Sequence, residues 1–187
     1  MSGVVGRTSR VRLAAALVAG AVLLSGCGSG AATASATTAM TGPGALPQTH
    51  RRPTLDAALQ KKMDDLWRAI VDDRPAEATS SFFPLAAYVQ VKDYRDPNRD
   101  WHVRLLASYD AIIHGLHRKL AGAAMVHPTL AIDHSNEVWV DPGVEHNKIG
   151  YWRVYHSTVS GDGRRFTVAT MISWRGEWYV VHLAKLS

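Results

Sequence analysis

The sequence has a single cysteine, Cys27, and its folded part has no excess of one charge. One cysteine excludes an intramolecular disulfide and a cysteine-based zinc site. Five of the 21 Lys and Arg residues precede Pro53, so residues 53–187 hold 16 basic and 16 acidic residues. The high isoelectric point therefore comes from the N-terminal leader and linker. A neutral domain offers no basic face, and we expect no nucleic-acid partner.

Motifs for common enzyme chemistry are also missing. The sequence has no G-x-S-x-G elbow, no glycine-rich phosphate loop and no H-E-x-x-H. The aspartates between Asp93 and Asp100 lack the glycine and the closing glutamate of a calcium loop, so we interpret them as a solvated turn. His114 and His117 lack an obvious third ligand. We expect no metal site and no cofactor.

The longest apolar run, Leu13–Leu24, follows three arginines within residues 1–12. It is too short for a permanent membrane helix, which needs about 20 apolar residues. A basic segment followed by a short apolar run is typical of a secretory signal peptide, which we assign to residues 1–26.

The signal ends in Leu24-Ser25-Gly26-Cys27, which resembles the lipobox of bacterial lipoproteins. The resemblance implies that Cys27 becomes the first mature residue and that its thiol receives a diacylglyceryl group. It also implies acylation of the new amino terminus, for example by palmitate. Two or three acyl chains suffice for stable anchoring. We expect a cell-envelope protein that Cys27 anchors to the membrane, with its domain on the extracytoplasmic side.

After the cysteine, Gly28–Gln48 contains Gly, Ala, Ser, Thr and Pro without charge or aromatic residues. Such a segment cannot bury enough apolar surface to offset its ordering entropy. We interpret residues 27–52 as the lipidated cysteine and a flexible tether, and residues 53–187 as one domain.

Apolar residues at three- and four-residue spacing predict helices over residues 55–73, 73–81 and 101–120. Ala87–Lys92 alternates β-forming residues and predicts a strand. Tyr94–Asp100 is rich in turn-forming residues and predicts a connection.

The last third of the chain predicts an antiparallel meander, because runs of β-branched and aromatic residues alternate with turn sequences. The predicted strands are 137–140, 151–159, 165–174 and 177–185. The class is therefore α+β, with N-terminal helices packed on a curved antiparallel sheet.

This order of elements resembles the cone-shaped, nuclear-transport-factor-two-like superfamily over residues 54–185. The resemblance rests on topology and on the closing pattern MISWRGEWYVVHL (Met171–Leu183). A cystatin-like sheet would fit the same pattern. Because this superfold hosts enzymes, ligand binders and interaction modules, it does not assign a function.

Candidate site residues lie on the long helix and on the strands. A helical projection places His102 toward the apolar stripe, and it places Asp110 and His114 on the outer face as a surface pair. Both faces of the last strand are apolar, so one should meet the helices while the other lines a cavity or a second subunit. The candidate pocket residues are His102, Tyr155, His156, Trp178 and His182.

These observations favour a non-catalytic domain that binds a small apolar ligand or an envelope protein outside the membrane. The alternative is a small enzyme of the cone-shaped fold acting on a hydrophobic substrate, with His102, Tyr155 or His182 in its cavity. A third hypothesis is a homodimer that pairs through the aromatic sheet face.

Replacement of the anchoring thiol tests the predicted lipidation. We expect Cys27→Ser to move the protein from the membrane fraction to the soluble fraction without unfolding the domain, because no acyl chain can attach. Cell fractionation and immunoblotting measure this distribution. A variant that stays in the membrane fraction would contradict the predicted anchor.

Overall fold

The structure, a computed structural model, describes residues 48–184. Its helical elements are α1 (Ala57–Val71), the 3₁₀ helix η1 (Pro75–Ser81), α2 (Leu85–Val91), α3 (Pro97–Asp100), the π-helical segment η2 (Trp101–Leu106), α4 (Ala107–Lys119) and the 3₁₀ turn η3 (His134–Asn136). The strands are β1 (Thr129–Ala131), β2 (Val138–Val140), β3 (Tyr151–Gly161), β4 (Arg164–Trp174) and β5 (Glu177–Leu183). The α+β class predicted from the sequence is confirmed.

The five strands form one antiparallel sheet with the order β1-β3-β4-β5, and β2 also pairs with β3. Strands β2 to β5 form the predicted meander. Strand β1 was not predicted. It pairs Leu130 with Val159, and β2 pairs Trp139 with Trp152 farther along β3.

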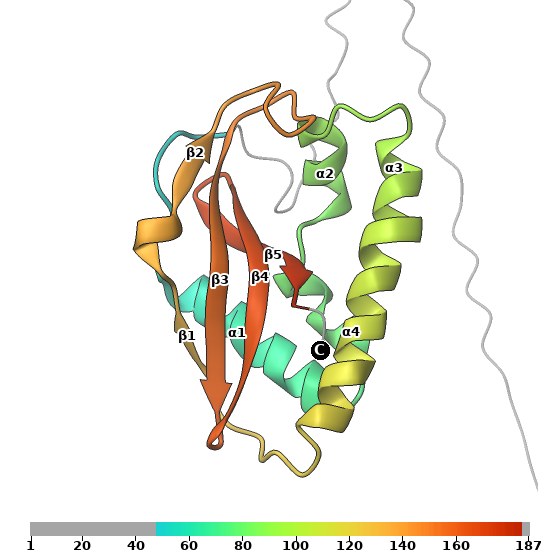
Figure 1. Cartoon of the computed structure of the whole chain (residues 1–187), viewed down its shortest axis with the longest axis vertical. Coiled ribbons are helices and arrows are strands. Elements are labelled where there is room, and N and C mark those ends of the chain that lie inside the picture. The colour runs from blue at the N-terminus through green and yellow to red at the C-terminus, as the bar shows by residue number, and fades with distance from the viewer. Residues whose placement is uncertain (1–47, 185–187) are drawn as a thin grey trace, which may run out of the picture. The chain divides into compact units, whose positions relative to one another are not determined.

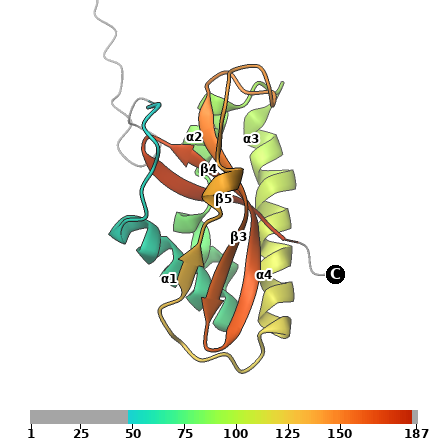
Figure 2. The ribbon, with the colours of Figure 1, turned by 60° about the vertical axis from the view of Figure 1, so that its left-hand side comes forward.

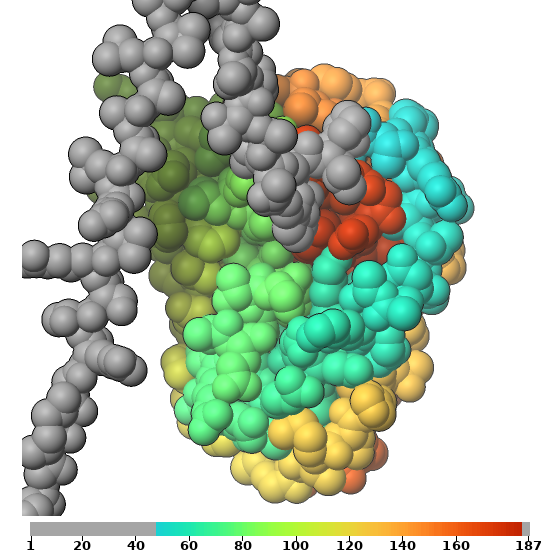
Figure 3. Space-filling view, turned by 180° about the vertical axis from the view of Figure 1, so that it is seen from behind, coloured from blue at the N-terminus to red at the C-terminus, as the bar shows by residue number. Residues whose placement is uncertain are grey.

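Helices α1 and α4 pack against the sheet. Helix α1 contacts β1 and β5 and crosses behind the β3–β4 hairpin in Figure 1, while α4 contacts β5 and runs beside the hairpin (Figure 2). Seen from behind, α1 in teal and the η1–α2 segment in green form much of the surface (Figure 3). The largest fully buried side chains are Trp67, Trp174, Trp178, Tyr88, Tyr151, Phe82 and Phe83.

The ends of α1 are held by side chains. Asp56 caps its first turn by accepting a hydrogen bond from the Leu59 amide at 2.9 Å. At the other end, His117 Nδ1 of α4 lies 3.0 Å from the Ile70 carbonyl. His114, expected in a surface pair with Asp110, instead lies 2.6 Å from an Asp73 carboxylate oxygen. The α4 imidazoles thus secure the end of α1, where carbonyls lack helical partners.

One predicted strand is wrong, because Ala87–Lys92 lies mostly in helix α2. Its buried residues Ala87, Tyr88 and Val91 follow helical spacing, and Pro84 precedes the helix in an extended conformation. The predicted turn over 94–100 is also partly wrong, because Asp96 caps a helix that begins at Pro97. Helix continues from there through η2 into α4.

Residues 48–52, which the sequence analysis assigned to the tether, are bound to the sheet. The Gln48 amide donates to the Gly150 carbonyl at 3.0 Å, and the Trp152 indole donates to the His50 carbonyl at 2.9 Å. Arg52 forms an ion pair with Glu137 at 3.0 Å. Residues 48–52 therefore belong to the folded domain.

Truncation of Trp178 tests the packing between sheet and helices. Its side chain is 1% exposed, so we expect Trp178→Ala to lower the free energy of unfolding by about 3–5 kcal/mol through lost burial and a residual cavity. Urea denaturation followed by circular dichroism measures the loss. The control is Val103→Ala, whose side chain is 66% exposed and for which we expect a change within about 0.5 kcal/mol. Equal effects of the two substitutions would contradict this packing.

Candidate functional site

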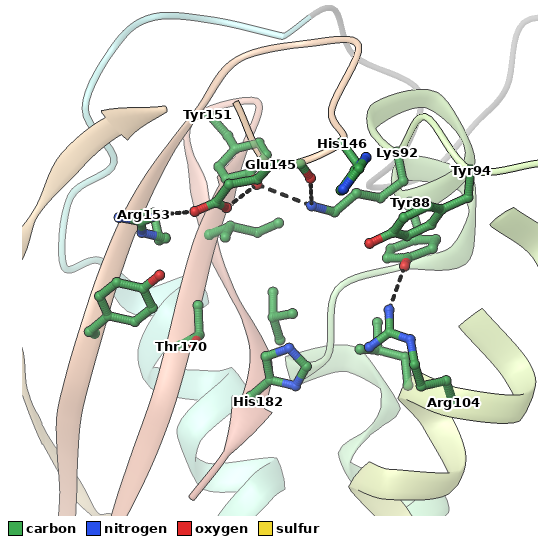
Figure 4. Close-up of a pocket in the computed structure, with 14 residues that line it drawn as sticks. Tyr88, Lys92, Tyr94, Arg104, Glu145, His146, Tyr151, Arg153, Thr170 and His182 are labelled. Atoms are coloured by element: carbon green, nitrogen blue, oxygen red, sulfur yellow. Dashed lines mark hydrogen bonds and ion pairs between the residues drawn. The ribbon is translucent and has the colours of Figure 1, made fainter. Parts of the chain in front are cut away.

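A cavity of about 310 Å³ lies between α2, the α3–α4 helix, the loop 141–150 and strands β3 to β5 (Figure 4). We call it the polar pocket. Leu105, Ile172 and Val181 supply its apolar surface. Its polar lining residues are Tyr88, Lys92, Tyr94, Arg104, Glu145, His146, Tyr151, Arg153, Tyr155, Thr170 and His182.

One side of the polar pocket is built by a network that starts at Lys92. Its ammonium donates to the Tyr151 hydroxyl and to the Glu145 carbonyl oxygen, each at 3.1 Å. Tyr151 in turn donates to the Glu145 carboxylate at 2.6 Å, and Arg153 forms an ion pair with the other carboxylate oxygen (Figure 4). The network joins α2, the loop 141–150 and β3.

The opposite side is built by Tyr88, Asp100 and Arg104. Arg104 makes two hydrogen bonds to the Asp100 carboxylate, at 2.8 and 2.7 Å, and a third to the Tyr88 hydroxyl at 3.0 Å. Tyr88 donates to the same carboxylate. The hydrogen bonds from Arg104 hold the pKa of Asp100 below its ordinary value, and burial with the Asp100 contact raises the pKa of Tyr88. Asp100 is therefore an anion and Tyr88 a neutral phenol at neutral pH.

The charges of the polar pocket do not balance. Arg104 is paired with Asp100 and Arg153 with Glu145, whereas the half-buried Lys92 forms no ion pair among the described residues. Burial, and secondarily the positive charge of Arg104, lower the pKa of Lys92. The Asp100 carboxylate opposes this lowering more weakly, because it is paired with Arg104 and makes no ion pair with Lys92. The desolvated ammonium therefore has no carboxylate of the described residues in direct contact, an arrangement that favours an anion in the cavity.

Other polar groups of the pocket are available to a ligand. Within residues 48–184, the side chains of Tyr94, Tyr155, Thr170 and His182 make no hydrogen bond. Arg153 lies over the Tyr155 ring at 4.3 Å, and its buried Nε has no partner among the described residues. The cavity thus presents unused donors beside its excess positive charge.

His182 projects from β5 toward the floor of the polar pocket (Figure 4). Desolvation, followed by the positive charges of Arg104 and Lys92, lowers its pKa below 6.5. Its imidazole is consequently neutral at pH 7 and can donate or accept a hydrogen bond.

The π-helical segment η2 brings Arg104 and Leu105 into the pocket. A π-helix has more residues per turn than an α-helix, so it rotates side chains away from their α-helical positions, and such segments are frequent at functional sites. His102, which an α-helical projection placed inward, is exposed in the structure, with its ring against Trp101 at 4.8 Å.

The five predicted pocket residues lie in different places. Tyr155 and His182 line the polar pocket. Trp178 belongs to the buried core, and the three residues that follow it on β5 are also buried within the chain. His156 is exposed and has a positive φ of 56°, in the left-handed region. His102 and His156 are not among the lining residues of the polar pocket.

Sequence reasoning missed Lys92, Arg104, Glu145 and Arg153 as site residues. They come from the residue after α2, from η2, from a loop and from β3, and they line one cavity only when these elements meet. Two signals could have found part of the set. Lys92 follows a largely apolar segment. Arg153 lies between Tyr151 and Tyr155 at alternate positions of β3.

A second cavity, of about 320 Å³, lies between the start of α1 and β1. Its described lining contains one charged residue, Asp56, whose carboxylate caps α1. The described residues contain no group of three side chains suited to a metal ion, and none of their helices is long and apolar enough to cross a bilayer. The polar pocket is therefore the stronger candidate site.

Comparison of the chain with protein-family models, with curated proteins and with solved structures gave no match.

The lowered pKa of His182 can be tested by titration. We expect its imidazole to titrate below pH 6.5, and we expect Lys92→Gln to raise the midpoint because a neighbouring positive charge is removed. In the unfolded chain, His182 has its ordinary pKa and therefore binds its proton at a higher pH than in the folded domain. Acidification through pH 6.5 should consequently destabilise the domain, and the loss of stability should be smaller in Lys92→Gln.

Imidazole carbon chemical shifts measured by NMR report the midpoint. Lys148→Gln, which alters an exposed lysine outside the polar pocket, is the control and should leave the titration unchanged. A midpoint that both substitutions move equally would contradict the proximity of Lys92 to His182.

Proposed function

We propose that this protein is a bacterial lipoprotein, anchored by Cys27 to the outer side of the cell membrane, whose domain binds a small anionic ligand in the polar pocket. The unpaired, half-buried ammonium of Lys92 carries the proposal. A charge held at that depth is stabilised by an opposite charge, and the pocket residues have already paired their own carboxylates. The charged lining favours an anion over the purely apolar ligand expected from the sequence.

Binding without catalysis is the better supported role. General-base chemistry needs a free group with a suitable pKa. Glu145 is held by Arg153 and Tyr151, and the pKa of Asp100 is lowered by its contact with Arg104, so both carboxylates are engaged in structural contacts. His182 is the group that would serve as a base if the domain were an enzyme.

We further propose that the domain has the nuclear-transport-factor-two-like arrangement. Three observations support this assignment: helices precede most of the sheet, strands β2 to β5 form a meander, and the polar pocket opens between helix and sheet. A cystatin-like arrangement is the alternative. The proposed ligand does not depend on this choice, because it rests on the pocket residues.

A substitution that fills the pocket tests the proposed function. Thr170 lines the cavity and makes no side-chain hydrogen bond with other described residues, so Thr170→Phe should occupy the ligand volume without breaking either network. We expect the intact protein, extracted in mild detergent, to carry a small molecule detectable by native mass spectrometry or to bind added carboxylates. Thr170→Phe should weaken that binding by about tenfold or more.

The matched control is Thr167→Phe, which adds the same ring on the same strand at a half-buried position outside the polar pocket. Equal binding by Thr170→Phe, Thr167→Phe and the unaltered protein would overturn the assignment of the pocket. An unaltered protein that neither carries a small molecule nor binds any carboxylate would overturn the binding function itself.

A further inference from the structure

A third cavity, a hollow of about 200 Å³, adjoins the polar pocket. The two share the lining residues Leu105, Val181 and His182, so they lie side by side along β5 and the α3–α4 helix. We call this hollow the apolar groove. Its other lining residues are Ser108, Tyr109, Ile112, Ala169, Leu183 and Ala184.

The apolar groove differs from the polar pocket in chemistry. Its described lining contains no Asp, Glu, Lys or Arg. The one titratable residue that it shares with the polar pocket is His182, whose lowered pKa leaves it neutral at pH 7. The Tyr109 hydroxyl is turned to the buried Ala78 carbonyl at 3.4 Å and is therefore engaged away from solvent. The two neighbouring hollows therefore offer a charged site and a mainly apolar site on either side of Leu105 and Val181.

The net charge of the polar pocket determines which ligand charge is favoured. Arg104 and Arg153 are each neutralised by a carboxylate, which leaves one excess positive charge on Lys92. A single negative charge compensates this ammonium, whereas a dianion would leave an uncompensated charge in a partly desolvated cavity.

We propose that the ligand is an amphiphilic monocarboxylate, with its carboxylate at Lys92 and its hydrocarbon part passing Leu105 and Val181 into the apolar groove. The inference rests on the proposed function and specifies its ligand class. The carboxylate supplies the missing counter-ion and can also accept hydrogen bonds from the unpartnered Tyr94 and Tyr155 hydroxyls of the lining. The hydrocarbon part leaves water for an apolar surface, which lowers its free energy.

A chain-length series tests the proposal on the intact protein in phospholipid nanodiscs. The probes are butyrate, hexanoate and octanoate, with 1-octanol as a neutral analogue. Thr170→Phe, whose pocket is filled, is measured in the same nanodiscs. Its signal gives the partition of each probe into the lipid, and this signal is subtracted from that of the unaltered protein. We expect affinity to rise about fourfold for each added methylene and 1-octanol to bind more weakly than octanoate. Ligand-observed NMR and calorimetry measure both trends.

Two substitutions distinguish the two hollows. Lys92→Met should weaken all three carboxylates by on the order of tenfold and abolish the preference over 1-octanol, because a charge-assisted contact is lost. Lys148→Met is the matched control for this change and should have no effect. Ala169→Phe fills the apolar groove, so it should flatten the chain-length dependence while butyrate binding persists.

Each contrary outcome has its own meaning. Equal affinity for butyrate and octanoate, or unchanged chain-length dependence in Ala169→Phe, would overturn the hydrocarbon subsite. Tighter binding of an alkyl phosphate dianion than of octanoate would overturn the monocarboxylate. If no probe binds but a co-purifying molecule is lost in Thr170→Phe, the proposed function stands and this inference fails.

Discussion

The hydrogen bonds of the Lys92 ammonium are the contacts on which the pocket end of the domain depends. They join the end of α2 to β3 through Tyr151 and to the loop 141–150 through the Glu145 carbonyl. Main-chain bonds reinforce the same junction, because the Asp93 amide donates to the His146 carbonyl and the Lys148 amide to the Val91 carbonyl, each at 2.7 Å. One short segment therefore both holds the loop in place and supplies the charge that defines the cavity.

The parts of the fold that the sequence predicted are those with a long, regular pattern. Helix α1 repeats its apolar spacing over its whole length. Strands β3 to β5 are runs of β-branched and aromatic residues, and the turn residues between them set the meander. Most of helix α2 was mistaken for a strand because a segment as short as Ala87–Lys92 fits both periods. Its buried Tyr88 and Val91 are three residues apart, which is helical spacing. In so short a segment this spacing distinguishes a helix from a strand only once the structure shows that both side chains are buried.

The site was less predictable than the fold because its chemistry is assembled across elements. Tyr155 and His182 could be found, because they are polar side chains on strands rich in aromatic and β-branched residues. Arg104 could not be placed, because the π-helical segment η2 rotates it away from the position that α-helical spacing assigns. Glu145 lies in a loop without a periodic pattern, and its partners Tyr151 and Arg153 lie six and eight residues farther along the chain.

The pocket opposes stability in a way that a ligand would relieve. Burying the Lys92 ammonium without a directly contacting carboxylate costs free energy. The lowered pKa of Lys92 reflects that cost, because the buried group loses its proton more readily than an exposed lysine does. An anion at Lys92 would reverse that preference and raise the pKa. By linkage, a ligand that binds the folded chain and not the unfolded one stabilises the fold according to its concentration and affinity. Because Lys92 also holds the loop over the cavity, occupancy would stabilise the segment that encloses the ligand, so binding and local order are coupled through one side chain.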